Sequence, residues 1–228
     1  MNKKLRVFAE LIEENSIQYR LKTILKYGDS WDLIGTIVMK NPGSASPRNI
    51  ISQEDFNNIK EYIYPNVEIE NWHEFNDDNT IKRISNIFDG TFLNKKSELN
   101  GIILIYNLFN IRENLIIEAV KKANLSNSEY LFPNLDELLT SSQNKPIYLG
   151  FNWEYTNKIN KHHPKIEKFA NDLFTYIKHS EYMYLEDEII NNFFYHPLSS
   201  QFSSLKYQHI LEKFYEKVLK SSVKEFKN

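Results

Sequence analysis

The feature that most constrains the fold is a set of four short apolar runs, each rich in β-branched or aromatic residues. They are residues 34–39, 101–108, 146–151 and 189–195. Runs of this length, ended by polar residues or turns, are typical of strands that are buried on both faces of a sheet. Patterns typical of helices separate or follow them, at residues 53–64, 78–93, 115–123, 135–141, 166–177 and 205–219.

This alternation of strands and helices favours right-handed β-α-β crossovers. We therefore predict an α/β fold with three layers, α/β/α, around a short, mostly parallel four-stranded central sheet. Residues 2–27 also carry apolar side chains at roughly helical spacing, so residues 1–30 are predicted to be an N-terminal helical region ahead of a core at 31–219. Because no repeat or low-complexity linker divides the chain, residues 1–228 are predicted to form one domain.

Composition narrows the classes of function. The chain has no cysteine, which excludes disulfides, thiolate catalysis and iron–sulfur clusters. The net charge of -2 implies no global attraction to nucleic acid. Lysines and arginines outnumber acidic residues at both ends, which suits either a local phosphate-binding face or two solvated amphipathic helices. No apolar stretch approaches the ~18 residues of a membrane span, and we expect a cytoplasmic protein.

Metal and cofactor motifs are not apparent in the sequence. His162 and His163 are adjacent and so point to different sides of a regular element, and no carboxylate stands at matched spacing to them or to His179. The chain has neither a phosphate-loop motif nor a Gly-x-Gly-x-x-Gly fingerprint. We therefore expect no metal and no cofactor.

Ligands of parallel sheets bind at the carboxyl ends of the strands, which directs attention to the loops beginning at Asn41, Asn107, Asn152 and His196. The carboxamide of Asn41 is able to fix a water through both its acceptor and its donor. Gly43 lets a ligand approach the backbone closely. The alternative is a strand-ending turn in which Asn41 satisfies its own backbone.

Asn107 ends an otherwise apolar run, and His196 follows another. A buried carboxamide must find partners, which are protein groups, waters or a ligand with both a donor and an acceptor, such as a nucleobase edge. A neutral histidine is able to donate a hydrogen bond to a developing oxyanion, although many single histidines are satisfied core residues. The hydroxyls that follow His196 suit phosphate contacts.

Together these segments resemble, in order and spacing, the motifs of the uracil-DNA glycosylase superfamily. The resemblance covers residues 31–219 and rests on Asn41-Pro42-Gly43, on the strand that ends at Asn107, on residues 147–153 and on His196-Pro197-Leu198-Ser199. The Asn-Pro-Gly form is more similar to the mismatch-specific and single-strand-selective branches than to the main branch. The chain also resembles an uncharacterised bacterial domain family with an Asn-Pro-Ser-x-Ala loop and an Asp-x-Thr-Ile-[Lys/Arg]-Arg helix start, as at residues 78–83.

The resemblance implies a role for each of these residues. Asn41 would position the water that attacks the sugar C1′, and His196 would stabilise negative charge on the base. Asn107 would hydrogen-bond the base edge, next to Gly43. Contacts with the DNA strand would come from Ser44, Leu198, Ser199, Ser200 and Lys206, where Leu198 fills the stack that the flipped nucleotide leaves.

The sequence thus predicts a monofunctional DNA glycosylase that hydrolyses the N-glycosidic bond of uracil or a related base. Its expected partner is uracil-containing DNA, single- or double-stranded, and a protein inhibitor is a further candidate partner of a monomeric enzyme. Two alternatives stay open. One is a catalytically weak or inactive member of the same fold that binds nucleic acid or a partner protein. The other is a hydrolase of free nucleosides or nucleotides.

Overall fold

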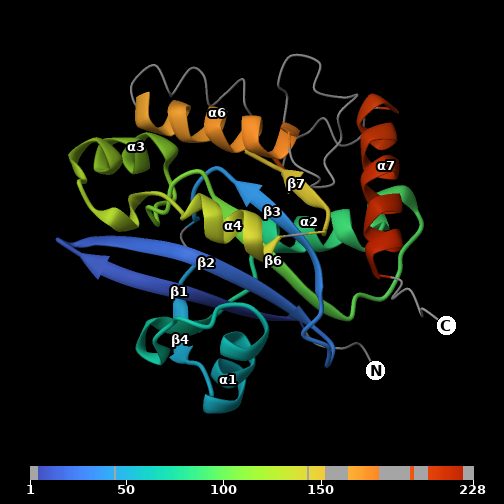
Figure 1. Cartoon of the computed structure of the whole chain (residues 1–228), viewed down its shortest axis with the longest axis horizontal. Coiled ribbons are helices and arrows are strands. Elements are labelled where there is room, and N and C mark those ends of the chain that lie inside the picture. Colours follow the sequence, from blue (N-terminus) through green and yellow to red (C-terminus); the bar gives the residue numbers. More distant parts are fainter. Residues whose placement is uncertain are drawn as a thin grey trace.

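The computed structural model contains a seven-stranded mixed sheet with the strand order β4-β5-β1-β2-β6-β3-β7 (Figure 1). It describes residues 5–43, 45–142, 144–151, 164–179, 196–197 and 205–222. The strands are β1 Arg6–Glu14, β2 Ile17–Tyr27, β3 Leu33–Met39, β4 Pro47–Ile50, β5 Trp72–Phe75, β6 Gly101–Asn107 and β7 Ile147–Leu149. The α-helices are α1 Gln53–Tyr62, α2 Asn79–Phe88, α3 Ile116–Leu125, α4 Leu135–Ser141, α6 Pro164–His179 and α7 Leu205–Ser222.

The α/β class is correct, but the prediction of a short, mostly parallel four-stranded sheet is wrong. Only β6, β3 and β7 run parallel to one another, whereas β4, β5, β1, β2 and β6 pair in antiparallel fashion. The predicted strands at 34–39, 101–108 and 146–151 correspond to β3, β6 and β7. The fourth predicted strand, at 189–195, lies outside the described residues.

The predicted N-terminal helical region is also wrong, because residues 6–27 form an antiparallel hairpin of β1 and β2. Asn15 and Ser16 connect the strands with φ angles of 51° and 62°, the backbone that a two-residue hairpin turn requires. Both strands lie inside the sheet and are covered on both faces, so the successive residues Val7, Phe8 and Ala9 are all buried. Burial on both faces removes the alternation that identifies a strand, and the remaining pattern imitates helical spacing.

The predicted helices are found, with shifts at their ends. Ser52 caps α1, and its hydroxyl accepts a hydrogen bond from the Asp55 amide at 3.1 Å. Asp78 caps α2 in the same way, since its carboxylate accepts from the Ile81 amide at 2.8 Å. The helix ends before Gly90, whose φ of 77° suits glycine. α2 is therefore shorter than the predicted 78–93.

Helices cover both faces of the sheet (Figure 1). One apolar cluster joins the sheet to α2 and α7, and a second joins its other face to α1, α3, α4 and α6. The connection from β3 to β6 places α1 on the second face and α2 on the first, and α3 and α4 follow β6 on the second face. The parallel strands β3 and β6 are direct neighbours, so their carboxyl ends lie at one edge of the sheet, where ligands bind in α/β sheets.

Candidate functional site

A cavity of about 230 Å³ lies at the carboxyl ends of β3 and β6, on the face that α2 covers. Its walls come from β2, β3, β6, the start of α2, the loops after β3 and β6, and His196. The lining residues are Arg20, Thr23, Met39, Asn41, Gly43, Asp78, Thr80, Ile81, Ile84, Ile105, Asn107, Glu113, Asn114 and His196. The structure thus brings the predicted residues Asn41, Gly43, Asn107 and His196 onto one cavity.

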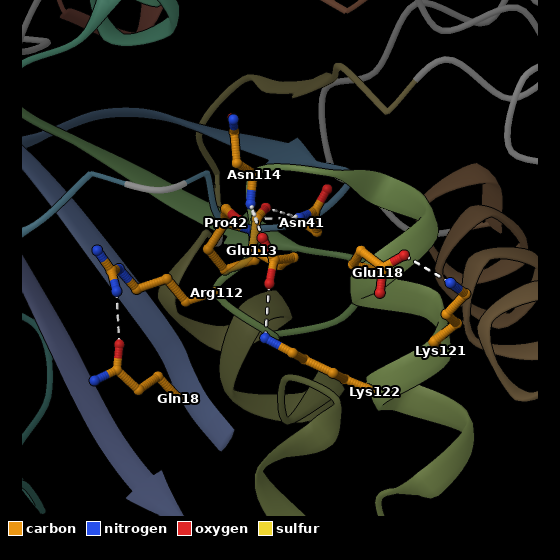
Figure 2. A network of polar contacts seen from close by, with 9 residues as sticks. All are labelled: Gln18, Asn41, Pro42, Arg112, Glu113, Asn114, Glu118, Lys121 and Lys122. Atoms are coloured by element: carbon orange, nitrogen blue, oxygen red, sulfur yellow. Dashed lines mark hydrogen bonds and ion pairs between the residues drawn. The ribbon is translucent and has the colours of Figure 1, made fainter. Parts of the chain in front are cut away.

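The carboxamide of Asn41 is held in one orientation. Its nitrogen donates to the backbone carbonyl oxygens of Pro42 and of Glu113, each at 2.9 Å (Figure 2). Because both partners are acceptors, the amide must turn its nitrogen toward them. Both N–H groups are thereby used, and the carbonyl oxygen of Asn41 is left as an acceptor at the pocket.

The loops after β3 and β6 hold each other at the pocket wall. The amide of Glu113 donates to the carbonyl of Pro42 at 3.2 Å, which adds to the bonds made by Asn41. The Glu113 carboxylate accepts from Lys122 on α3 at 2.6 Å and from the Asn114 amide at 2.8 Å (Figure 2). The hydrogen bond from Lys122, followed by that from the Asn114 amide, lowers the pKa of Glu113, so this carboxylate is ionised at neutral pH.

Asn107 is 2% exposed and is the polar end of β6, whose residues are all buried. Its side chain lines the pocket, and within the described residues no hydrogen bond joins its carboxamide to another group. A buried carboxamide without a partner among these residues offers two donors and an acceptor to a molecule in the cavity. This arrangement favours the ligand-binding interpretation over the structural one.

His196 lines the pocket as an electrically neutral side chain. Burial, followed by the nearby positive charge of Lys40, lowers the pKa of His196 to about 4, and the charge of Asp78 opposes this shift. Burial likewise lowers the pKa of Lys40 to about 8. At neutral pH the imidazole is therefore uncharged and lies near a cationic lysine.

Arg20 and Thr23 also line the pocket, and the sequence analysis did not single them out. Strand residues three apart normally face opposite sides. Here Thr23 pairs with Ala9 and Arg20 pairs with Leu11, so β2 has one residue more than β1 between these pairs. This β-bulge turns both side chains to the pocket face. No sequence signal marks the bulge, and the segment looked helical.

The start of α2 contributes the segment that resembles the second, uncharacterised family. Asp78, Thr80 and Ile81 all line the cavity that Asn41 and Gly43 line. A side chain added at Gly43 would find the Asp78 carboxylate as its nearest neighbour, at 4.0 Å. The two motifs of that family-like pattern therefore meet across one pocket, although 35 residues separate Gly43 from Asp78 in the sequence.

The remaining predicted site residues are not placed at the pocket. Ser44, Leu198, Ser199 and Ser200 lie outside the described residues, and Lys206 belongs to α7 with a side chain that is likewise outside the description. Five aromatic residues between β4 and α2 have rings of a kind that stack on a base, and none of them lines the cavity: Phe56, Tyr62, Tyr64, Trp72 and Phe75.

A larger cavity, of about 510 Å³, lies on the opposite face of the sheet. It borders the amino-terminal parts of β3 and β6, at Leu33 and Ile102, and includes Tyr64, Glu137 and Ser141. None of the residues predicted for the site lines it. We therefore assign the candidate site to the smaller pocket, because ligands of such sheets bind at the carboxyl ends of the strands.

The described residues contain no cluster of three or more histidine, aspartate or glutamate side chains with the geometry of a metal site. Within the same part of the chain, no helix combines the length and the apolar character that a membrane crossing needs.

Fold and pocket together describe an α/β protein with a polar pocket at the carboxyl ends of two parallel strands of a mixed sheet. No family model matches the chain, and neither a curated protein nor a solved structure matches it. The resemblance to uracil-DNA glycosylases therefore stays a prediction from the sequence motifs.

Proposed function

We propose that this protein hydrolyses the N-glycosidic bond of uracil, or of a related base, that has been flipped out of DNA. The observation that carries the proposal is the meeting of Asn41, Asn107 and His196 on one small cavity. These residues come from three distant segments, and their chemistry is complementary. One offers an oriented acceptor, one an unused carboxamide, and one a neutral imidazole.

The reaction needs a water near the sugar and a place for negative charge on the base. The free oxygen of Asn41 accepts a hydrogen bond from the water, whose oxygen forms the new bond to C1′. The C1′–N bond breaks, and its electron pair leaves with the base. Neutral His196 donates a hydrogen bond to the base oxygen where this charge develops. Because a carboxamide does not take a proton, the proton released by the water goes to solvent.

The pocket suits a small ligand built on one aromatic ring. Its volume of about 230 Å³ is below the roughly 300–1,000 Å³ of sites for drug-sized ligands. Met39, Ile84 and Ile105 supply apolar walls for the ring faces, and Asn107 has both donors and an acceptor for the ring edge.

A binding protein without catalytic activity is the second candidate. Two observations favour it: no aromatic side chain lines the described part of the pocket, and position 41 carries an amide with no negative charge to balance a sugar cation. A hydrolase of free nucleosides is the third candidate, which the pocket carboxylates Asp78 and Glu113 favour because they repel the DNA backbone.

One experiment separates the three candidates. Purified protein is incubated at high concentration with single- and double-stranded uracil-containing oligonucleotides and with free uridine and deoxyuridine, and released base is measured by chromatography. Release from oligonucleotides supports the proposal, and release from nucleosides alone supports the third candidate. Salt-dependent DNA binding without release supports the second.

We propose a cytoplasmic location with this function, which the lack of cysteine supports.

A further inference from the structure

Arg20 places a positive charge at the end of the pocket that faces β2, and the proposed base-excision reaction does not use this charge. The side chain of Arg20 lines the cavity, and its Nε atom is buried without a hydrogen-bond partner. No ion pair joins its guanidinium to any described residue. The guanidinium carbon lies 5.6 Å from the centroid of the Phe75 ring.

The carboxylate whose charge acts most on Arg20 is that of Asp78, and one of its oxygens already caps α2. Burial lowers the pKa of Arg20 to about 10, with the like charge of Arg112 acting in the same direction, so the guanidinium stays charged at neutral pH. The Arg20 residue as a whole is half-buried, but its Nε–H is buried without a partner among the described residues. An unsatisfied buried donor costs free energy, which a ligand that accepts its hydrogen bond would recover.

Thr23, on the same wall of the pocket, also has a buried polar atom without a hydrogen-bond partner among the described residues. The residue is 3% exposed, and the atom is its hydroxyl oxygen. The bulge in β2 is what turns Thr23 to the face of Arg20. Two neighbouring unsatisfied donors therefore line one end of the cavity.

The two ends of the pocket are separated by the width of β6. The strand order β2-β6-β3 places Arg20 and Thr23 two strands away from Asn41. With about 4.8 Å between neighbouring strands, the span is roughly 10 Å. A ligand whose base lies beside Asn41 therefore reaches Arg20 only if it carries a further group that extends past β6.

We propose that Arg20 and Thr23 form an anion subsite, so that the ligand of this pocket carries a phosphate or carboxylate group in addition to its base. This inference rests on the proposed function only in taking the cavity as the ligand site. It adds a substrate class, because a base with a charged group is preferred to a neutral base. The guanidinium gives two charge-assisted hydrogen bonds to such a group, and the threonine hydroxyl gives a third.

The test compares three probes by isothermal titration calorimetry: uracil, which is neutral, orotate, which adds a carboxylate, and uridine 5′-monophosphate, which adds a phosphate. We expect at least one charged probe to bind the wild type about tenfold or more tightly than uracil, since hydrogen bonds to charged groups are strong. The charged probe that binds more tightly identifies the group. Equal binding of all three probes would overturn the proposal.

Variants show whether these residues carry the preference. In Arg20→Met the charged probe should bind no more tightly than uracil. The thermal midpoint of this variant should equal or exceed that of the wild type, because a charged side chain with an unsatisfied buried Nε–H is removed. A lower midpoint with the preference intact would mean a structural role and would refute the proposal. Thr23→Val, which keeps the shape of the side chain, should weaken the preference severalfold and gives a second test if Arg20→Met does not fold. The control is Arg83→Met, at an exposed site on α2 outside the pocket lining.

The base-release assay remains a separate readout. If the charged probes are preferred but no base is released, the anion subsite stands and the glycosylase proposal fails. If base is released but all probes bind equally, the anion subsite fails and the glycosylase proposal stands.

Discussion

The carboxamide nitrogen of Asn41 donates a hydrogen bond to the backbone carbonyl oxygen of Glu113, 72 residues further along the chain, at 2.9 Å. A second bond, to the carbonyl oxygen of Pro42, uses its other N–H group. This pair connects the loop after β3 to the loop after β6 and directs the Asn41 oxygen as an acceptor. The site therefore requires an amide at position 41, where the main glycosylase branch has an aspartate.

Asn41→Asp should consequently impair the protein. A carboxylate has no hydrogen to give to the two carbonyls and is repelled by them. We expect both Asn41→Ala and Asn41→Asp to lose about 1–3 kcal/mol of unfolding free energy, for two hydrogen bonds, with the aspartate variant the less stable at pH 7. Urea unfolding measures this. Asn57→Asp on α1 is the control, because the exposed Asn57 oxygen acts as an acceptor, which aspartate preserves. An aspartate variant as stable as the wild type would contradict the orientation of Asn41.

The lowered pKa of His196 makes stability depend on pH. Between about pH 4 and its ordinary value of 6.5, the unfolded chain binds a proton at His196 that the folded chain does not bind. Unfolding free energy should therefore fall as pH falls through this window, by about 2 kcal/mol after allowance for solvent screening.

Replacing the imidazole tests this dependence. His196→Asn should lose less stability than the wild type when unfolding free energy is compared at pH 4.5 and pH 7. His209→Asn, at an exposed position of α7, should follow the wild type. Equal pH dependence in the wild type and in His196→Asn would show that the imidazole is not buried as described.

Gly35 in β3 and Gly43 at the pocket should respond differently to replacement by alanine. A Cβ at Gly35 would lie 2.8 Å from both the Phe88 ring and the Pro146 carbonyl oxygen, so Gly35→Ala should destabilise the fold by about 1–3 kcal/mol. A Cβ at Gly43 meets nothing nearer than the Asp78 carboxylate, at 4.0 Å. Gly43→Ala should therefore change unfolding free energy by less than about 0.5 kcal/mol and weaken ligand binding, because its methyl group stands among the pocket lining. Uracil affinity that is unchanged in Gly43→Ala would place the base elsewhere.

A glycine substitution tests the hairpin of β1 and β2, because it should stabilise the protein in the hairpin turn but destabilise it inside a helix. Ser16 has a φ of 62°, which costs a non-glycine residue free energy. Ser16→Gly should therefore stabilise the protein by about 0.5–1 kcal/mol, net of the added freedom of the unfolded chain. A glycine inside a helix would instead destabilise by about 1 kcal/mol, as expected for Lys121→Gly at the exposed face of α3. Thermal unfolding should show a higher midpoint than the wild type for Ser16→Gly and a lower one for Lys121→Gly.

The parts of the fold that the sequence predicted are those whose signals are local. β3 and β6 are continuous apolar runs that end at polar residues, and the caps Ser52 and Asp78 stand directly before periodic segments. β1 and β2 were missed because burial on both faces removes alternation, and the turn Asn15-Ser16 was their one clear signal. β4 and β5 have four residues each and depend on pairing with distant segments.

The candidate site divides in the same way. Asn41, Gly43, Asn107 and His196 follow apolar runs, so strand ends identified them as residues to examine. Arg20 and Thr23 reach the pocket through a bulge in an antiparallel strand, which is a property of the register between β1 and β2. Glu113 and Asn114 reach it through contacts with the loop after β3. Neither property can be seen in a single segment of sequence.

The most direct measurement is the single-turnover rate constant of uracil release from a single-stranded oligonucleotide, with the enzyme in excess. We predict measurable release by the wild type and a loss of about 10²–10³-fold in His196→Ala, the effect of removing one oxyanion donor. Asn41→Ala should also lose most of the rate, and His209→Ala should retain it. No release by the wild type on single- or double-stranded substrate, or equal rates in the wild type and His196→Ala, would contradict the proposed function.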